Sequence, residues 1–445
     1  MHAFAVTVAR RSRITTRTLE RCRCSGGGEF DNSQLCTKIE QMLTKLGQVM
    51  DLESAKPETV GLSASRLQGL MAVLTDEVAR KRLPGAVALV ARHGQIALFD
   101  SVGELNAQTG EAMHRNARFR IYSMTKPIVS VATMMLMEQG RLLLADPVSR
   151  FLPEFAAQQV AVYVDGELRL QPAARQASVH DLLRHTAGMT YEFLGASPVQ
   201  RQYSQLRLNS RERSLAEFTG QLAGLPLLFE PGAAFEYSRA TDVLGRVVEV
   251  VAGQSLPDFL RQRIFDPLGM PDTAFQVNPE HHEHIAEPFS RDPDGAPVMR
   301  VIDVRTDAML ASGGGGLVST AMDYARFLQF MLNRGELGGV RLLGPHTVDF
   351  MTTDHLGELP IASQGSRALL PPGHGFGLGF AVRKQLGVAP VPGSAGTYFW
   401  GGLAGTSFFV DPVLQLFGCL MLQAPNQREY YRMLFRNLVY ASVMD

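Results

Sequence analysis

The order of strand-like and helix-like segments constrains the fold most strongly. Two apolar segments, residues 85–91 and 95–102, flank His93-Gly94 and predict a hairpin near the front of the chain. Residues 150–300 have mostly helical patterns. Strand patterns return only near the other end, at residues 375–382, 398–400, 406–410 and 414–422. The simplest closed arrangement is one sheet built from both ends of the chain, with the helical part inserted between them, which is an α+β fold.

Helical patterns account for most of the remaining chain. Residues 66–82 repeat apolar side chains at helical spacing, and an apolar-rich helix is expected from Ser123 to about residue 140. We therefore expect residues 57–445 to form one domain. It would consist of a sheet subdomain (about 57–150 and 300–445) with a mostly helical subdomain (about 151–299) inserted in it. Further helices are expected at residues 240–252, 322–333 and 427–443.

The first 56 residues differ in character from the rest. Residues 1–24 contain six arginines and a single acid, Glu20, and Gly26-Gly27-Gly28 then form a natural break. We interpret residues 1–56 as a basic, disordered extension, and the alternative is an organelle-targeting transit peptide. The apolar run before the arginines is too short for a secretory signal. No stretch of the chain is long and apolar enough to span a membrane.

Charge and cysteine content narrow the class of function. The formal net charge is zero, and the pI is about 7.2. This balance does not predict a nucleic-acid partner. Three of the four cysteines lie in the extension and only Cys419 lies beyond it, so no disulfide framework is implied. A reducing, cytoplasmic setting fits best.

Lysine is rare in this chain, and one lysine has a suggestive position. Six lysines stand against 37 arginines, and Lys126 follows Ser123 in the one S-x-x-K of the sequence. Arginine replaces lysine in most surface roles but cannot lose its proton at working pH. A desolvated lysine can do so and can then accept a proton from a nearby hydroxyl. The motif predicts a serine nucleophile with a lysine partner. The same residues also suit a structural role, in which the serine caps the helix N-terminus and the lysine is solvated.

Two later motifs also contain residues suited to catalysis or to ligand binding. Tyr237 lies where a loop enters the helix at residues 240–252, and a phenol whose pKa is lowered by an ammonium group can act as a general base. Trp400-Gly401-Gly402 includes the one tryptophan of the chain, and its glycines let a ligand approach the backbone. Taken singly, each motif also suits a purely structural role.

Together these motifs resemble the serine β-lactamase and penicillin-binding-protein superfamily. Within it, the chain is most similar to the class-C-like branch called family VIII carboxylesterases. The resemblance covers roughly residues 57–440. Connecting segments agree with it: residues 182–189 (LLRHTAGM), 264–270 (IFDPLGM), 312–320 (SGGGGLVST) and 324–327 (YARF).

The resemblance implies a β-lactamase-like fold and a catalytic serine that needs no cofactor or metal. Ser123 is expected to attack the acyl carbon, while Lys126 and Tyr237 share the role of base. The oxyanion would lie between the backbone N–H groups of Ser123 and Leu403. Trp400, Gly401 and Gly402 would contact a small-molecule ester, and the oligomeric state stays open.

Two departures from the family pattern bear on the substrate. Relatives that cleave β-lactams or peptidoglycan usually carry Lys-Thr-Gly where this chain has Trp400-Gly401-Gly402, so a carboxylate would lack its paired cation. Arg239 stands where those relatives often carry asparagine. Both departures favour neutral, short-chain esters. The alternatives are a β-lactamase or D-alanyl-D-alanine carboxypeptidase, and a catalytically silent binding or scaffold protein on the same fold.

Other catalytic motifs are absent or weak. The sequence has no G-x-S-x-G, the nucleophile elbow of α/β-hydrolases. His281, His282 and His284 cluster without an H-E-x-x-H, so we interpret them as solvated side chains and expect no metal there.

Overall fold

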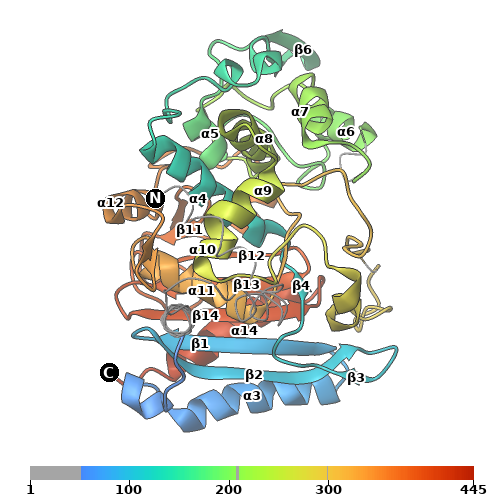
Figure 1. Cartoon of the computed structure of the whole chain (residues 1–445). Coiled ribbons are helices and arrows are strands. Elements are labelled where there is room, and N and C mark those ends of the chain that lie inside the picture. The colour runs from blue at the N-terminus through green and yellow to red at the C-terminus, as the bar shows by residue number, and fades with distance from the viewer. Residues whose placement is uncertain (1–51, 207–209, 298) are drawn as a thin grey trace, which may run out of the picture.

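The computed structural model describes residues 52–206, 210–297 and 299–445 (Figure 1). The expectations for the basic extension, for its glycine break and for Cys22, Cys24 and Cys36 fall on residues 1–51, outside the described residues. No helix in the described ranges is long and apolar enough to cross a membrane.

One eight-stranded antiparallel sheet joins the two ends of the chain, as the sequence predicts. β1 (Gly85–Arg92) pairs with β2 (Gln95–Asn106) on one side and with β14 (Leu416–Gln423) on the other. Every residue of β1 and β14 is buried, which explains why both sequences are apolar up to their last residues, Arg92 and Gln423. The order is β10-β11-β12-β13-β14-β1-β2-β3, where the remaining strands are β3 (Glu111–Ala112), β10 (His374–Phe376), β11 (Ala381–Arg383), β12 (Tyr398–Gly401) and β13 (Gly405–Asp411).

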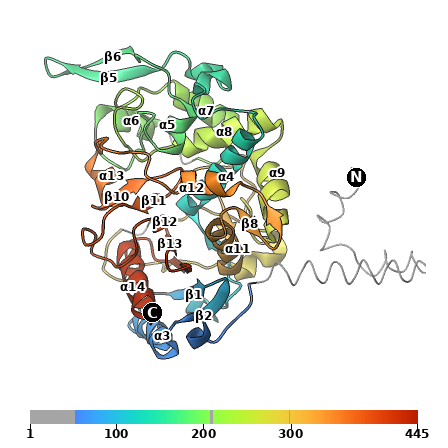
Figure 2. The ribbon, with the colours of Figure 1, turned by 90° about the vertical axis from the view of Figure 1, so that its left-hand side faces the viewer.

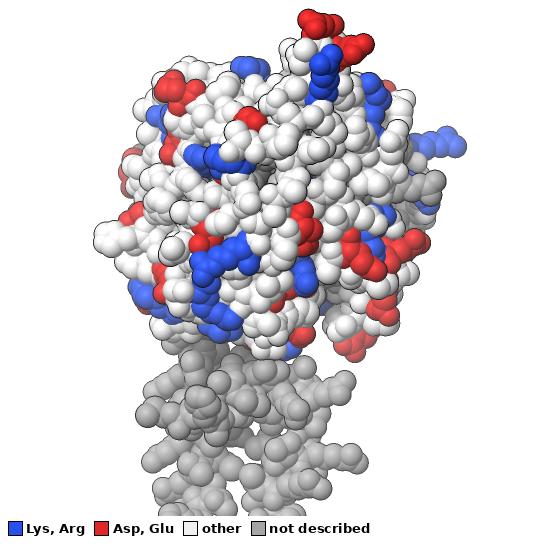
Figure 3. Space-filling model, turned by 90° about the horizontal axis from the view of Figure 1, so that it is seen from above, with Lys and Arg blue, Asp and Glu red and all other residues white. Residues whose placement is uncertain are grey.

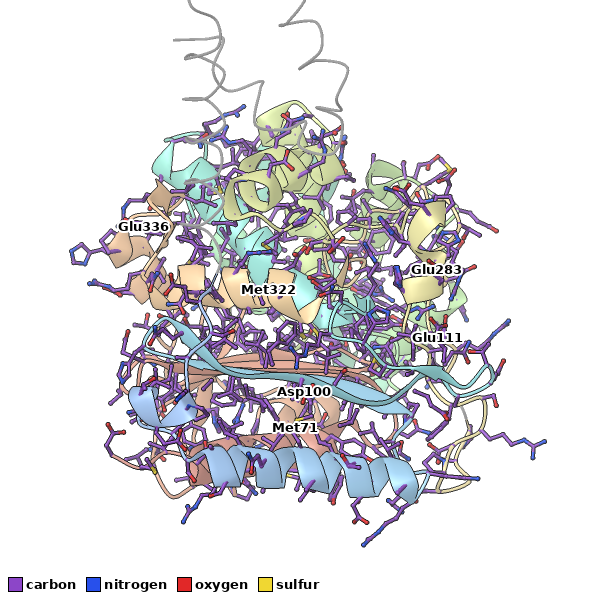
Figure 4. The ribbon with its side chains drawn as sticks, turned by 60° about the horizontal axis from the view of Figure 1, so that its bottom comes forward. Met71, Asp100, Glu111, Glu283, Met322 and Glu336 are labelled. Carbon is purple, nitrogen blue, oxygen red and sulfur yellow. The ribbon has the colours of Figure 1, made fainter. Side chains whose placement is uncertain are left out.

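Helices cover both faces of this sheet. α3 (Ala64–Ala79) and α14 (Arg428–Ala441) pack on one face around a core that includes Leu70 and Phe435. Figure 4 shows α3, with Met71, on one side of the strand that carries Asp100, and α11 (Ala321–Leu332), with Met322, on the other side. The prediction of an α+β fold with an antiparallel sheet between helices is confirmed.

The helical part lies beyond the α11 face and forms the upper half of the molecule in Figure 1. α4 (Thr125–Glu138) lies at its centre and packs against α8 (Ala240–Ala252), a helix that the sequence predicts correctly. Three shorter helices contact this pair: α5 (Val179–Leu183), α7 (Leu215–Ala223) and α9 (Leu256–Leu260). The other short helices are α6 (Pro198–Gln205), α10 (Asp266–Leu268), α12 (Pro345–Met351) and α13 (Gln364–Leu369).

Two segments differ from the sequence expectation. Residues 150–300 are not only helical, because β5 (Gln159–Val164) and β6 (Glu167–Pro172) form a hairpin that projects from the molecule (Figure 2). Its turn, Asp165-Gly166, has positive φ at both residues, the geometry for which Asp-Gly is a strong hairpin signal. Short two-stranded pairs also occur elsewhere: β4 (Phe119–Arg120) with β7 (Val318–Ser319), and β8 (Glu336–Leu337) with β9 (Val340–Arg341).

The single strand expected at residues 375–382 is instead the hairpin β10–β11. Gly379 lies in its turn with φ +100°, a conformation that favours glycine. A Cβ at this position would come 2.5 Å from the Ser130 hydroxyl of α4. The apolar residues at 375–382 predict extended structure. The chain turns at Gly379, where α4 comes too close to leave room for a side chain.

Candidate active site

Ser123 lies in a tight turn rather than in the helix itself. The turn is a 3₁₀ segment, Tyr122–Met124, directly before α4. Tyr122 has φ +42°, which is strained for a residue with a bulky side chain, and its hydroxyl accepts a hydrogen bond of 2.8 Å from the Ile302 backbone. Such strain persists only where surrounding contacts hold it, and it often occurs beside functional groups.

Lys126 is fully buried and lies beside Ser123. Its Nζ donates to the Ser123 hydroxyl at 3.3 Å, the Tyr191 hydroxyl at 2.9 Å and the Gly314 carbonyl at 2.7 Å. Burial lowers the pKa of Lys126 to about 7; the Arg239 charge acts in the same direction, and the Asp242 carboxylate opposes it. Near neutral pH, a large fraction of Lys126 is therefore an uncharged amine that can accept a proton.

Tyr237 joins the same cluster from the loop before α8. Its hydroxyl accepts a hydrogen bond of 3.1 Å from Trp400 Nε1, and its ring centroid lies 4.6 Å from Lys126 Nζ. Burial raises the pKa of Tyr237, although its interactions with Ser123 and Trp400 act in the opposite direction. The expectation of a phenol with a lowered pKa is therefore wrong, because desolvation of the phenolate outweighs the nearby nitrogen.

The glycine loop before α11 carries a residue that sequence reasoning missed. Asp242 on α8 accepts hydrogen bonds from the Ser312 hydroxyl at 2.5 Å and from the Gly314 backbone at 2.9 Å. A Cβ on Gly314 would come 2.6 Å from the Asp242 carboxylate. Asp242 thus holds the loop whose Gly314 carbonyl accepts from Lys126. The glycine run is visible in the sequence, whereas no local pattern marks Asp242 as the residue that binds it.

Tyr191 and Glu192 were also missed. Tyr191 is buried, and its hydroxyl contacts Lys126 while its ring centroid lies 4.6 Å from the Arg239 guanidinium. Glu192 Oε1 lies 2.6 Å from Arg239 Nη2, and both side chains are almost completely buried. Arg239 lines the site, as its place in the motif suggested, but Glu192 balances its charge.

The Trp400-Gly401-Gly402 segment closes the opposite side of the site. Trp400 is buried near the end of β12, and its Nε1 donates a hydrogen bond to the Tyr237 hydroxyl. A Cβ on Gly402 would come 2.5 Å from the Ile121 carbonyl, which directly precedes the Ser123 turn. A Cβ on Gly401 would come 2.5 Å from the guanidinium of Arg432 on α14. Glycine lets β12 approach both the turn and α14.

Two backbone donors border the same space. Ser123 and Leu403 line the pocket, and neither backbone N–H donates a hydrogen bond to another residue within the described ranges. Buried N–H groups are normally paired, so unpaired donors beside a nucleophile suit a developing negative charge.

These groups open into one pocket of about 410 Å³. It runs from Ser123 and Tyr237, past Trp400 and Leu403, to side chains of α14. The face of the molecule shown in Figure 3 carries no dominant charge, because acidic and basic side chains are interspersed over it.

The histidine cluster holds no evident metal site. His284 Nδ1 lies 3.2 Å from His114 Nε2, and His282 Nε2 lies within hydrogen-bond distance, 3.0 Å, of the Val277 carbonyl oxygen. Over the ranges that the structure covers, no group of three or more histidine, cysteine, aspartate or glutamate side chains could hold a metal ion.

Comparison with known proteins places these features in context. The model of the family described as Beta-lactamase matches residues 67–440. Esterase EstB of Burkholderia gladioli is 35% identical over 82% of this chain and 93% of its own length. The structure of EstCE1, described as a hydrolase with promiscuous acyltransferase activity, superposes with a TM-score of 0.70 at 29% identity, over 84% of this chain and 98% of that one. Lovastatin esterase of Penicillium rubens is 30% identical over 77% of this chain and 89% of its own length.

Proposed function

Because the chain belongs to the beta-lactamase family and is an enzyme of the serine hydrolase type, we propose that it is a carboxylesterase that acts through an acyl-enzyme on Ser123. The observation that carries the proposal is the fully buried Lys126, which donates to the Ser123 hydroxyl at 3.3 Å and whose pKa is lowered to about 7. Such an amine suits a base far better than a structural ion pair.

The first half of the reaction would form the acyl-enzyme. Lys126 accepts the Ser123 proton as Oγ attacks the acyl carbon, and the N–H groups of Ser123 and Leu403 stabilise the oxyanion. The bond between the acyl carbon and the alcohol oxygen then breaks. Tyr237, which keeps its proton because its pKa is raised, gives that proton to the leaving alkoxide and is reprotonated by Lys126.

In the second half, water attacks the acyl carbon and transfers its proton through Tyr237 and Lys126. The bond to Ser123 breaks, the hydroxyl regains a proton, and the acid leaves. The residues thus return to their starting protonation states.

We propose short, neutral acyl groups for the substrate. The pocket has a volume of about 410 Å³, and apolar side chains such as Phe193 and Leu310 line it together with Ser123. A β-lactam also needs a cation for its carboxylate at the third motif, where this chain has Trp400-Gly401-Gly402.

A substrate panel tests the proposal. p-Nitrophenyl esters with two to twelve acyl carbons would be compared with a chromogenic cephalosporin, using kcat/KM. We expect a maximum at short chains and turnover of the cephalosporin lower by at least about 10²-fold, since an unpaired buried charge costs several kcal/mol. Equal efficiency on both would favour the β-lactamase alternative, and no turnover of either would favour a silent binding protein.

Ser123→Ala supplies the matched test of the nucleophile. It should abolish turnover and prevent labelling by a fluorophosphonate probe, while Ser65→Ala, at an exposed position of α3, should change neither. A probe adduct on any other serine would refute the assignment.

A further inference from the structure

The projecting hairpin β5–β6 carries an exposed apolar face. Its register pairs Tyr163 with Leu168 and Ala161 with Leu170, and directly paired residues point to the same face of a two-stranded sheet. This face is therefore apolar at each of these positions, although Tyr163 is 62% exposed and Leu170 is 45% exposed. A two-stranded hairpin is at best marginally stable in water, so an exposed apolar face on one favours a further contact.

The outer edge of β6 is unpaired as well. On β5, the Ala161 N–H donates to the Leu227 carbonyl at 2.9 Å, so the backbone groups of Ala161 point away from β6. Leu170 lies opposite Ala161, and its backbone groups therefore point away from β5. Leu168, two residues earlier, has the same outward orientation. No backbone group of β6 bonds outside the hairpin within the described ranges, so this edge presents free donors and acceptors.

Two opposite charges lie along this edge. Glu167 and Arg169 are on the face of the hairpin opposite the apolar one, across from Val164 and Val162. Both side chains are exposed, and neither has an ion-pair partner in the described part of the chain. Figure 2 shows the hairpin standing clear of the helical part of the molecule. The edge is therefore accessible and carries charges that its own hairpin does not pair.

A second copy of β6 complements this edge in one particular register. Antiparallel pairing about a two-fold axis at Leu168 puts Glu167 opposite the partner's Arg169, and the symmetry repeats the ion pair. On the apolar face, the same register continues the row from Tyr163 and Leu168 to the partner's Leu168 and the partner's Tyr163. A shift of one residue, with the axis at Arg169, would set like charges opposite each other, which is destabilising.

We propose that the outer edge of β6 is a dimer interface for a second copy of this chain, in which two β5–β6 hairpins join into one larger antiparallel sheet centred on Leu168. An identical strand supplies the matching charges, the matching apolar row and the backbone groups together. The inference does not depend on the proposed ester hydrolysis. A single pair of short strands is a small interface, so we expect a Kd of roughly 1–100 µM.

Charge reversals test the register. Glu167→Arg and Arg169→Glu each set like charges opposite one another at both symmetric positions, so each should raise the Kd by at least about 10-fold. An equal mixture of the two proteins should regain dimers, because each then meets opposite charges on its partner. The double variant Glu167→Arg/Arg169→Glu should dimerise like wild type, since it exchanges the two charges.

Sedimentation velocity of the full chain, from about 1 to 100 µM, measures these changes without any substrate. The matched control is Asp76→Arg on α3, which reverses an exposed acid at the opposite end of the molecule in Figure 1. It should leave the Kd as in wild type. Recovery of dimers in the mixture would support the proposal most strongly, because loss of folding in either variant could not produce it.

Truncation of the hairpin tests the interface independently of its register. Replacement of residues 163–168 by a two-residue turn removes Tyr163 and Leu168 together and should give a folded monomer. Wild type that stays monomeric at about 100 µM would overturn the proposal, as would a dimer that persists after truncation. A dimer that truncation abolishes but that neither single charge reversal weakens would overturn the pairing about Leu168.

Discussion

At the residue scale, Lys126 differs from every other lysine in the described chain in having no contact with solvent. Its three acceptors, Ser123, Tyr191 and Gly314, come from three separate segments. Arginine would keep the charge but could not accept a proton. We expect Lys126→Arg to lower kcat by about 10²-fold or more, nearly as far as Lys126→Ala.

The matched control for that prediction is Lys384→Arg. Lys384 pairs with Asp354 at 2.8 Å and is partly exposed, so arginine should serve there equally well. A Lys126→Arg enzyme with nearly wild-type kcat would show that Lys126 supplies only charge.

The pKa of Lys126 also predicts a pH profile. Its pKa is lowered from 10.5 to about 7, so the base form accumulates, and kcat/KM should rise, as pH increases through about 7. The Arg239 charge contributes to this lowering. Arg239→Met should therefore move the rising limb to higher pH. A limb that stays in place would argue against Lys126 as the titrating base.

Tyr237 allows an equally sharp comparison. Tyr237→Phe removes the proton donor for the leaving alcohol and should lower kcat by about 10²-fold. Tyr398→Phe is the control, because the Tyr398 hydroxyl is buried and has no hydrogen-bond partner among the described residues, so its loss should cost little. Equal kcat values for the two variants would remove Tyr237 from the mechanism.

At the scale of elements, the approach of β12 to the Ser123 turn sets the geometry of the site. Gly402→Ala would bring a Cβ 2.5 Å from the Ile121 carbonyl, so either the strand or the turn must shift. We expect a loss of about 1–3 kcal/mol in the free energy of unfolding and a clear fall in kcat.

Gly220→Ala on α7 is the corresponding control. A Cβ there meets nothing within 4 Å, and alanine favours a helix, so stability should be unchanged or slightly higher. Thermal unfolding and ester turnover measure both variants. A Gly402→Ala enzyme with unaltered Tm and kcat would show that the close approach is unimportant.

At the scale of the whole molecule, the sheet depends on pairing between distant parts of the chain. β14 lies between β13 and β1, so it joins the strands of the C-terminal part to those of the front hairpin. Deletion of residues 416–445 should leave β1 and β13 without their partner, and the protein should be insoluble or lack cooperative unfolding by circular dichroism.

The projecting hairpin β5–β6 offers a contrasting deletion. Outside the hairpin, its backbone pairing among the described residues is a short contact between residues 159–161 and Leu227. Replacement of residues 163–168 by a two-residue turn should retain folding and ester hydrolysis. Loss of the fold in this variant, or its survival in the larger deletion, would contradict this view of the sheet.

Sequence by itself determined the elements and residues whose signals are local. The unbroken apolar runs of β1 and β14 predicted buried strands, and the spacing of Ser123 and Lys126 predicted a nucleophile beside a lysine. The order of the motifs predicted the family, which the comparisons confirm. These features depend on nearest neighbours along the chain or on motif order, so a sequence displays them directly.

Tertiary structure decided the surroundings of the same residues. Burial lowers the pKa of Lys126 and raises that of Tyr237, and Asp242, Tyr191 and Trp400 reach them from other segments. Arg432 reaches the pocket only because α14 packs on the sheet. Desolvation and charge pairing act through space, between residues far apart in sequence, so only the folded chain determines them.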